Sequence, residues 1–408
     1  MFFHLILQNE LEKGKPVKLF LFSYMRGGSS IAGELFNCDL SATMWYEPGD
    51  AFFSSYYGLY HENLPQHDLY FKNMTRRKLK SNELDAMANF YNNIFSCNYE
   101  ELPPEAMAHY FLTESTAMDG YVNCMRGKRT RNININSCNK HTQSFCSRNM
   151  VETSLGAQCH STLAAVRAIV QIHPDVRNES DLFNLIKNET DLINSSLIEP
   201  NQLIQFVRQA LCVETMRSDN GKCISGAKRK CHRDKLRVVQ VNRMKMEDLE
   251  PLIRDNPDSY VIHYTRDPRA VALSRYNTGV LIFDKANRSI VNEAQFICLR
   301  MREDIRQRII LEKKYPGVIT HLTYERLALD PKGAAKTIYG LFNGTYPKKW
   351  NQFVAQHMYG HLESNGFGIT VKNATKTANK WKLKIHKSQI NRINHFCKDV
   401  IIDLGYQL

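Results

Sequence analysis

Residues 17–30 read VKLFLFSYMRGGSS, and this stretch decides the fold class. The apolar and aromatic run that opens it predicts a buried strand, the Gly-Gly pair predicts a turn, and the apolar residues that follow recur at the spacing of a helix. Glycines let the backbone approach a ligand closely, and the first turn of a helix offers unpaired N–H groups to an anion. The stretch predicts an anion-binding loop, with an ordinary turn as the alternative. The candidate ligands are Arg26, Gly27, Gly28, Ser29 and Ser30.

A second strand-to-helix junction carries arginines. Residues 259–265 predict a buried strand, and the sequence RDPRAVALSR follows it directly. Arg266 stands at the strand end and Ser274 about two turns into the next helix, so both side chains could contact one phosphate. Arg269 either assists there or is a surface charge. The alternative for the whole motif is an Asp-Pro helix start with solvated arginines.

The rest of the chain continues the alternation of strands and helices. This alternation predicts an α/β fold, a P-loop-like parallel sheet flanked by helices, in which ligands bind beyond the carboxyl ends of the strands. Further strands are expected at 236–244 and 318–324, and helices at 153–172, 246–254, 292–314, after Pro331 and at 388–404.

No linker, low-complexity tract or internal repeat divides the 408 residues, so we expect a single domain over 17–408. Residues 1–16 are interpreted as a short N-terminal segment, a truncated stem or anchor. Residues 98–150 are rich in Cys and Asn and have little periodicity, which favours an insertion outside the sheet. No apolar run reaches the ~18–20 residues that a membrane-spanning helix needs.

Eleven cysteines are many for a reducing compartment, and eight of them fall between residues 97 and 231. No C-x-x-C pair is present, so we expect disulfides in an oxidising lumen and no metal. An odd count leaves one cysteine unpaired within a monomer, which keeps a homodimer open. Seven Asn-x-Ser/Thr sequons also indicate secretory routing, at Asn73, Asn178, Asn188, Asn194, Asn287, Asn343 and Asn373.

The net charge of +13 favours an anionic partner. Nucleic acid is not expected, because the short basic clusters are dispersed and no zinc-finger spacing or RNA-binding aromatic motif accompanies them. A nucleotide triphosphatase or kinase-like transferase is not expected either, because the G-x-x-x-x-G-K-[ST] loop is absent. A donor with fewer phosphates and no metal suits arginines and backbone amides better.

Residues 26–37 followed by Trp45-Tyr46-Glu47-Pro48 closely resemble the Golgi carbohydrate sulfotransferases that 6-O-sulfate galactose, N-acetylglucosamine or N-acetylgalactosamine. The stretches 264–275, 323–331 and 381–406 resemble later segments of the same family. The resemblance implies the sulfotransferase fold, a glycan or proteoglycan acceptor, and a type II membrane protein of the Golgi lumen whose anchor is not visible here.

The resemblance also implies 3′-phosphoadenosine 5′-phosphosulfate (PAPS) as the donor. Arg26 to Ser30 would then form the 5′-phosphosulfate loop, and Arg266 with Ser274 would bind the 3′-phosphate, with Arg269 assisting or not. Arg26 would also stabilise the charge that develops as the sulfuryl group leaves. Arg243 is a weaker candidate for an acceptor contact.

Sulfuryl transfer to a sugar hydroxyl needs a general base, worth ~10²–10⁴-fold in rate. We predict Glu47 for this role by its resemblance to the family's glutamate; the alternative is a structural carboxylate that holds a loop arginine. His263 alternates within an apolar strand and is expected to be a core histidine. A catalytically inactive carbohydrate-binding protein of the same fold is the alternative function.

Overall fold

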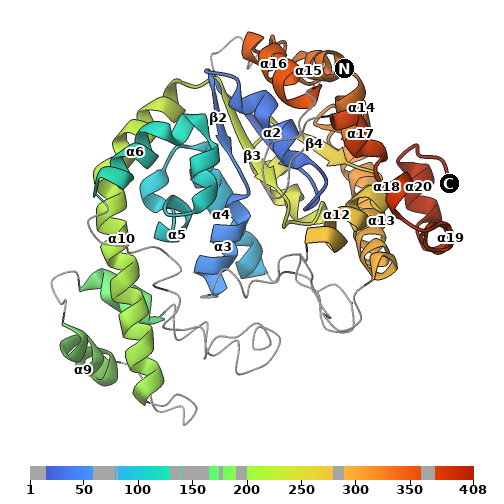
Figure 1. Ribbon diagram of the computed structural model, residues 1–408. Coiled ribbons are helices and arrows are strands. Elements are labelled where there is room, and N and C mark those ends of the chain that lie inside the picture. The colour runs from blue at the N-terminus through green and yellow to red at the C-terminus, as the bar shows by residue number, and fades with distance from the viewer. Residues whose placement is uncertain are drawn as a thin grey trace.

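The centre of the molecule is a five-stranded parallel sheet (Figure 1). This computed structural model describes residues 15–57, 79, 81–128, 138, 165–173, 178–189, 200–278, 289–359 and 373–408. The strand order is β2-β3-β1-β4-β5, so the first strand of the chain lies in the middle. The predicted α/β class is confirmed. The strands are β1 (Val17–Phe22), β2 (Ala42–Trp45), β3 (Leu236–Val241), β4 (Ser259–Thr265) and β5 (Ile319–Thr323).

Both faces of the sheet are covered, which explains why its strands are almost continuously apolar. Alternate residues of β1 point to opposite faces: Phe20 and Phe22 belong to one hydrophobic cluster, Leu19 and Leu21 to the other. The first cluster includes α4 (Ser81–Phe95), α10 (Pro200–Arg233), α11 (Glu250–Asp255), α12 (Pro268–Thr278) and α13 (Ile290–Lys314). The second includes α2 (Ser29–Asn37), α14 (Tyr324–Leu329), α15 (Pro331–Gly340), α16 (Lys348–Phe353) and α17 (Ala374–Asn379).

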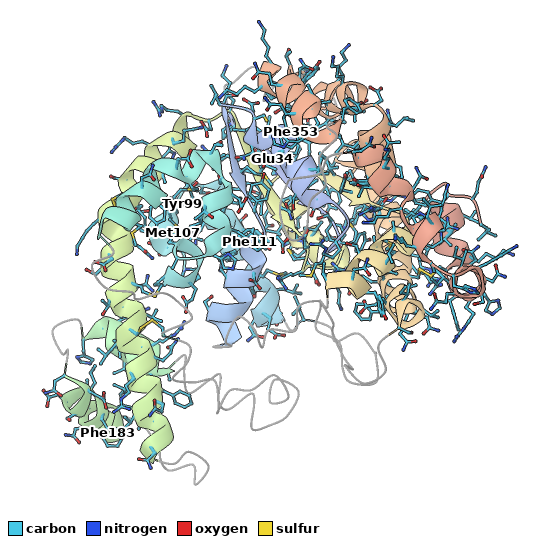
Figure 2. The ribbon with its side chains drawn as sticks, viewed as in Figure 1. Glu34, Tyr99, Met107, Phe111, Phe183 and Phe353 are labelled. Carbon is cyan, nitrogen blue, oxygen red and sulfur yellow. A yellow bond between two sulfur atoms is a disulfide. The ribbon has the colours of Figure 1, made fainter. Side chains whose placement is uncertain are left out.

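A long helix, α10, runs along one side of the molecule and is fastened by three disulfides (Figure 1). Their partners lie in or beside the predicted insertion, and Tyr99 and Met107 from that region pack on the α10 side of the sheet (Figure 2). The described part of 98–150, namely 98–128 and 138, contains helices and no strand. The disulfides are Cys97–Cys231, Cys124–Cys223 and Cys138–Cys212.

The remaining helices lie around this frame. They are α3 (Pro48–Tyr57), α5 (Pro104–Met107), α6 (Asp119–Lys128), α9 (Glu179–Glu189), α18 (Trp381–Lys384), α19 (Lys387–Phe396) and α20 (Lys398–Asp403). Short single-turn elements are η2 (Tyr99–Glu101), η3 (Tyr110–Glu114), η4 (Thr116–Met118), η7 (Glu247–Leu249) and η8 (Val354–Met358). None of the helices in these described ranges combines the length and apolar character that crossing a membrane requires.

The sequence prediction was wrong about the C-terminal helix. Instead of one helix over 388–404, two helices meet at Cys397, whose disulfide to Cys298 ties this end to α13. Most of the helix expected at 153–172 lies outside the described residues, which begin there at 165. The domain boundaries stay a prediction, and the segment 1–16 falls almost wholly outside the described residues.

Candidate active site

The first junction is a tight loop that only glycine can form at two positions. Gly28 has φ +86°, and a Cβ there would lie 2.4 Å from the Tyr324 ring; a Cβ on Gly27 would lie 2.8 Å from the Tyr24 carbonyl oxygen. α2 begins at Ser29 without a side-chain cap, so its first amide groups have no capping side chain. The loop therefore presents backbone donors and the positive end of the helix dipole.

The second junction meets this loop. Arg26 Nε donates to Ser274 Oγ on α12 at 3.2 Å, and Arg266 Nη1 contacts the Arg26 carbonyl oxygen at 3.5 Å. Burial lowers the pKa of Arg26, and the nearby charge of Arg266 lowers it further. The three side chains predicted for the donor are thus brought together, and we call Arg26, Arg266 and Ser274 the arginine cluster.

Two contacts fix the Arg266 side chain, and its Nε–H group has no acceptor among the described residues. Its Nη2 donates to the Thr377 carbonyl oxygen at 2.9 Å, and its guanidinium lies 4.3 Å from the centre of the Tyr324 ring. Its Nε is buried and has no hydrogen-bond partner among the described residues. A buried, unmatched donor of this kind is costly unless a ligand satisfies it.

Arg269 is not a surface charge, because only 3% of it is exposed. It forms a two-point ion pair with Asp267, at 2.9 Å from Nε and 2.8 Å from Nη2, and lies 4.1 Å from the centre of the Trp381 ring. It also donates to Asn394 and to the Gln407 carbonyl oxygen. These contacts favour a structural role, and the predicted assistance to the donor stays a prediction.

Glu47 follows β2 and lies close to the loop. Gln240 of β3 connects the two, because its Nε2 donates to Ser29 Oγ at 3.1 Å and to Glu47 Oε1 at 3.4 Å. Burial raises the pKa of Glu47, whereas the Arg243 guanidinium, 3.7 Å from Oε2, opposes that rise. Tyr46, the preceding residue, donates to the buried Glu34 of α2 at 2.6 Å and so fixes this backbone.

Two site residues were missed by the sequence reasoning, Asp50 and His109. Arg243 forms an ion pair with Asp50 at 3.1 Å, which is shorter than its contact with Glu47, and His109 Nε2 lies 2.9 Å from the other Asp50 oxygen. We call Glu47, Arg243, Asp50 and His109 the carboxylate cluster. Asp50 could have been noticed as the carboxylate one helical turn after Glu47. His109 carries no local signal, and an acceptor contact by Arg243 stays a prediction.

Both residues predicted to be catalytic have strained backbones. Only four non-glycine residues in the described part of the chain have positive φ, and they include Arg26 at 68° and Glu47 at 43°. Such conformations cost about 1–3 kcal/mol and persist where the surroundings enforce them, often at functional sites. The other two are Cys97 and Asn343, so half of these strained positions are residues predicted to be catalytic.

His263 is a core residue, as expected. It is fully buried, its Nε2 lies 2.9 Å from Tyr24 Oη, and burial lowers its pKa well below the ordinary value. A neutral, enclosed imidazole of this kind supports the sheet behind the loop. Across the described ranges, no group of three His, Cys, Asp or Glu side chains is placed to hold a metal ion.

The geometry as a whole suits transfer of an anionic group. The arginine cluster and the α2 amides offer positive charge and N–H donors, and the Glu47 carboxylate, paired with Arg243, lies beside them. The model of the Sulfotransferase family matches residues 137–347, just over half of the chain. The chain belongs to the sulfotransferase family. The match includes the second junction and Arg243, whereas the first loop and Glu47 precede it.

The individual relatives of this chain are distant. Human carbohydrate sulfotransferase 2 is 24% identical over a match that covers 42% of this chain and 40% of the relative; for human carbohydrate sulfotransferase 1 the values are 24%, 42% and 44%. The chain thus spans less than half the length of these relatives. The predicted resemblance to carbohydrate sulfotransferases is confirmed.

Solved structures that this chain is similar to include sulfotransferase STF9 from Mycobacterium avium, with 10% identity and a TM-score of 0.36, covering 100% of this chain and 82% of that one. Retinol dehydratase in complex with androsterone and inactive cofactor PAP has 11% identity and a TM-score of 0.35, covering 97% and 83%. At these values neither likeness bears on the chemistry of this chain.

Proposed function

We propose that this sulfotransferase moves the sulfuryl group of PAPS to a hydroxyl group of a glycan, at the 6-position of galactose, N-acetylglucosamine or N-acetylgalactosamine. The proposal rests on one observation: Arg26, Arg266 and Ser274 meet beside the N-terminus of α2, which has no side-chain cap. Glu47 lies nearby and accepts a hydrogen bond from Gln240. The distant carbohydrate sulfotransferases support the acceptor class.

The residues present fit a donor with two separate anionic groups. The unmatched Nε of Arg266 and the hydroxyl of Ser274 suit a phosphate at the second junction. The glycines of the first loop leave room for a second anionic group against the α2 amides. An anion between Arg26 and Arg266 would also relieve the repulsion that lowers the pKa of Arg26.

The proposed mechanism assigns a separate role to each cluster. When bound, PAPS supplies a sulfuryl group on a phosphate oxygen. Glu47 accepts the proton of the acceptor hydroxyl as its oxygen bonds to sulfur, and Arg26 with the α2 amides stabilises the charge left on the phosphate oxygen when the S–O bond breaks. The proton then passes from Glu47 to solvent, which restores the carboxylate.

The compartment is part of the proposal. Four disulfides join described cysteines, and Cys38 is free. Disulfides persist in oxidising lumens, where glycans are assembled and modified. We therefore place the reaction in the Golgi lumen, with a glycan or proteoglycan as the acceptor.

The test is transfer of labelled sulfate from PAPS to galactose-, N-acetylglucosamine- and N-acetylgalactosamine-terminated oligosaccharides. The native protein is compared with Glu47→Gln and with Glu101→Gln, an exposed glutamate on η2, as the matched control. We expect Glu47→Gln to lose ~10²–10⁴-fold in turnover while it still binds 3′-phosphoadenosine 5′-phosphate (PAP), and Glu101→Gln to match the native protein.

The other outcomes separate the parts of the proposal. Native turnover by Glu47→Gln would remove this residue from the mechanism. If the native protein binds PAP and transfers sulfate to none of the acceptors, the catalytically inactive carbohydrate-binding alternative replaces the enzyme. If it does not bind PAP at all, the proposed donor is wrong.

A further inference from the structure

Positive charge is concentrated in one short segment near the C-terminus. Residues 373–398 contain seven Lys and Arg residues and no Asp or Glu. Because the whole chain carries +13, the other 382 residues together carry only +6. The 26-residue segment thus supplies more than half of the net charge, which dispersed solubility charges would not do.

These seven cations are exposed and lack carboxylate partners. None of them forms an ion pair with any residue that the structure describes. Some exposed lysines elsewhere do, for example Lys222 with Asp219 and Lys314 with Glu250. We call the seven residues the basic surface: Lys376, Lys380, Lys382, Lys384, Lys387, Arg392 and Lys398.

The helices that carry the basic surface, from α17 to α20, are joined directly to the second junction. Arg266 donates to the Thr377 carbonyl oxygen of α17, and Arg269 lies against Trp381 of α18 and donates to Asn394 of α19. Figure 1 shows the four helices together at the C-terminal side of the molecule, next to α12 and α13. A long ligand on this surface would therefore lie near the arginine cluster.

We propose that the basic surface binds a polyanionic glycan, a chain with repeated sulfate or carboxylate groups, and so delivers an anionic acceptor to the site. This proposal rests on the proposed function for its link to turnover, but not for the binding itself. Nucleic acid is the weaker partner because the disulfides indicate an oxidising lumen. A membrane is also the weaker partner, because the exposed large apolar side chains of these four helices are few and lie on three different helices: Leu383, Phe396 and Ile402.

Such binding is electrostatic and has a defined kinetic signature. Exposed cations gain little from a single anion, but several in a row gain from a polyanion and lose that gain as salt screens them. Because the basic surface lies outside the two clusters of the candidate active site, it would contribute to acceptor binding equally in the ground state and the transition state. Its loss should therefore raise KM and leave kcat unchanged.

The experiment compares two triple variants that remove the same charge. One is Lys382→Gln/Lys384→Gln/Lys387→Gln on the basic surface. The control is Lys332→Gln/Lys336→Gln/Lys348→Gln on α15 and α16, whose lysines are also exposed and without a described ion pair. The probes are fluorescent chondroitin sulfate oligosaccharides and neutral dextran oligosaccharides. Their binding is measured by fluorescence anisotropy in about 0.1 M salt, without PAPS.

We expect the basic-surface variant to bind chondroitin sulfate about tenfold more weakly than the native protein, with a flatter salt dependence, and the control to bind within about twofold. Dextran should bind none of the proteins measurably. In sulfate transfer from PAPS, the basic-surface variant should have a higher KM than the native protein for an anionic acceptor, but the same KM for a neutral one. Absence of sulfate transfer would contradict the proposed function and leave the binding result standing.

Three results would overturn the inference. Equal weakening in both triple variants would show a response to net charge alone. Unchanged binding in the basic-surface variant would exclude this surface. Tighter binding of duplex DNA or of phosphatidylserine vesicles than of chondroitin sulfate, lost in the same variant, would assign the surface to a different class of partner.

Discussion

The two charge clusters at the carboxyl edge of the sheet differ in how their charges are balanced. In the carboxylate cluster, Arg243 bridges Asp50 and Glu47, so each charge has an opposite neighbour. In the arginine cluster, Arg266 Nη1 contacts the Arg26 carbonyl oxygen, the charge of Arg266 opposes that of Arg26, and Arg266 forms no ion pair with a described residue. Carboxylates therefore contact Arg243 directly, whereas Arg266 has no such contact among the described residues, which suits an anion that arrives from outside.

This difference predicts which property a mutation changes, the stability of the fold or the binding of a ligand. Removing a charge from a compensated, buried cluster leaves its partner unmatched and weakens the fold. Removing the Arg266 charge relieves repulsion within the arginine cluster, so its main cost falls on the binding of the ligand. The second junction offers a direct comparison, because Arg266 and Arg269 are three residues apart, and of the two only Arg269 forms a buried ion pair with a described residue.

The largest expected effect is on stability, from Arg269→Ala. The variant strands the Asp267 carboxylate, which is 4% exposed, and removes the guanidinium from the Trp381 face. Breaking a buried ion pair by removing one partner costs about 3–5 kcal/mol, so unfolding in urea should show a loss of this size. Arg254→Ala, which removes an exposed pair with Asp255, is the control and should leave stability unchanged. A native stability for Arg269→Ala would contradict the structural role.

A smaller effect, on ligand binding, is expected from Arg266→Ala. The lost charge-assisted contact should weaken PAP binding by about 1.5–3 kcal/mol, which is roughly 10- to 150-fold. The stability of the free protein should fall less than in Arg269→Ala, because Arg266 forms no ion pair with a described residue and loses only its contacts with Thr377 and Tyr324. Calorimetry gives the affinity, and the rise in melting temperature with PAP gives an independent measure. Equal losses of stability in both arginine variants would remove the distinction between the clusters.

The sequence predicted the parts of the site that depend on local pattern. The loop from Arg26 to Ser30 and the strand end at Arg266 could be located because apolar runs mark strands and the following residues must emerge at the same edge. Glu47 was predicted by resemblance, and in the structure the Gln240 side chain donates to both Glu47 and Ser29. These inferences needed only the parallel sheet to be correct.

The rest of the site depends on contacts between distant parts of the chain. His109 meets Asp50 across 59 residues, and Arg269 meets Asn394 and Gln407 across 125 and 138. A single sequence contains no signal for such pairs. The sequence therefore left Arg269 equally compatible with a donor contact and with a surface charge. The disulfide pairing was equally inaccessible, because the cysteine spacing is compatible with many connectivities.

The smallest expected effect is a shift in pH dependence, from Asp50→Asn. Burial raises the pKa of Glu47 and the Asp50 charge raises it further, while Arg243 lowers it. A base must be ionised, so turnover falls as the pH falls through this raised pKa. Asp50→Asn removes the repelling charge and leaves the Arg243 guanidinium to Glu47, and both changes lower the pKa. The acidic limb of the pH–kcat profile should therefore move to lower pH.

Two controls make this shift informative. The other titratable groups that act on Glu47 are Arg26 and Tyr91, and Asp50→Asn leaves both side chains in place. Asp258→Asn removes the same charge at the opposite edge of the sheet, beside Lys18, and should leave the profile in place. A shift of the limb to higher pH, or an equal shift in both variants, would mean that Arg243 does not divide its charge between Asp50 and Glu47. The carboxylate cluster would then hold the loop without tuning its base.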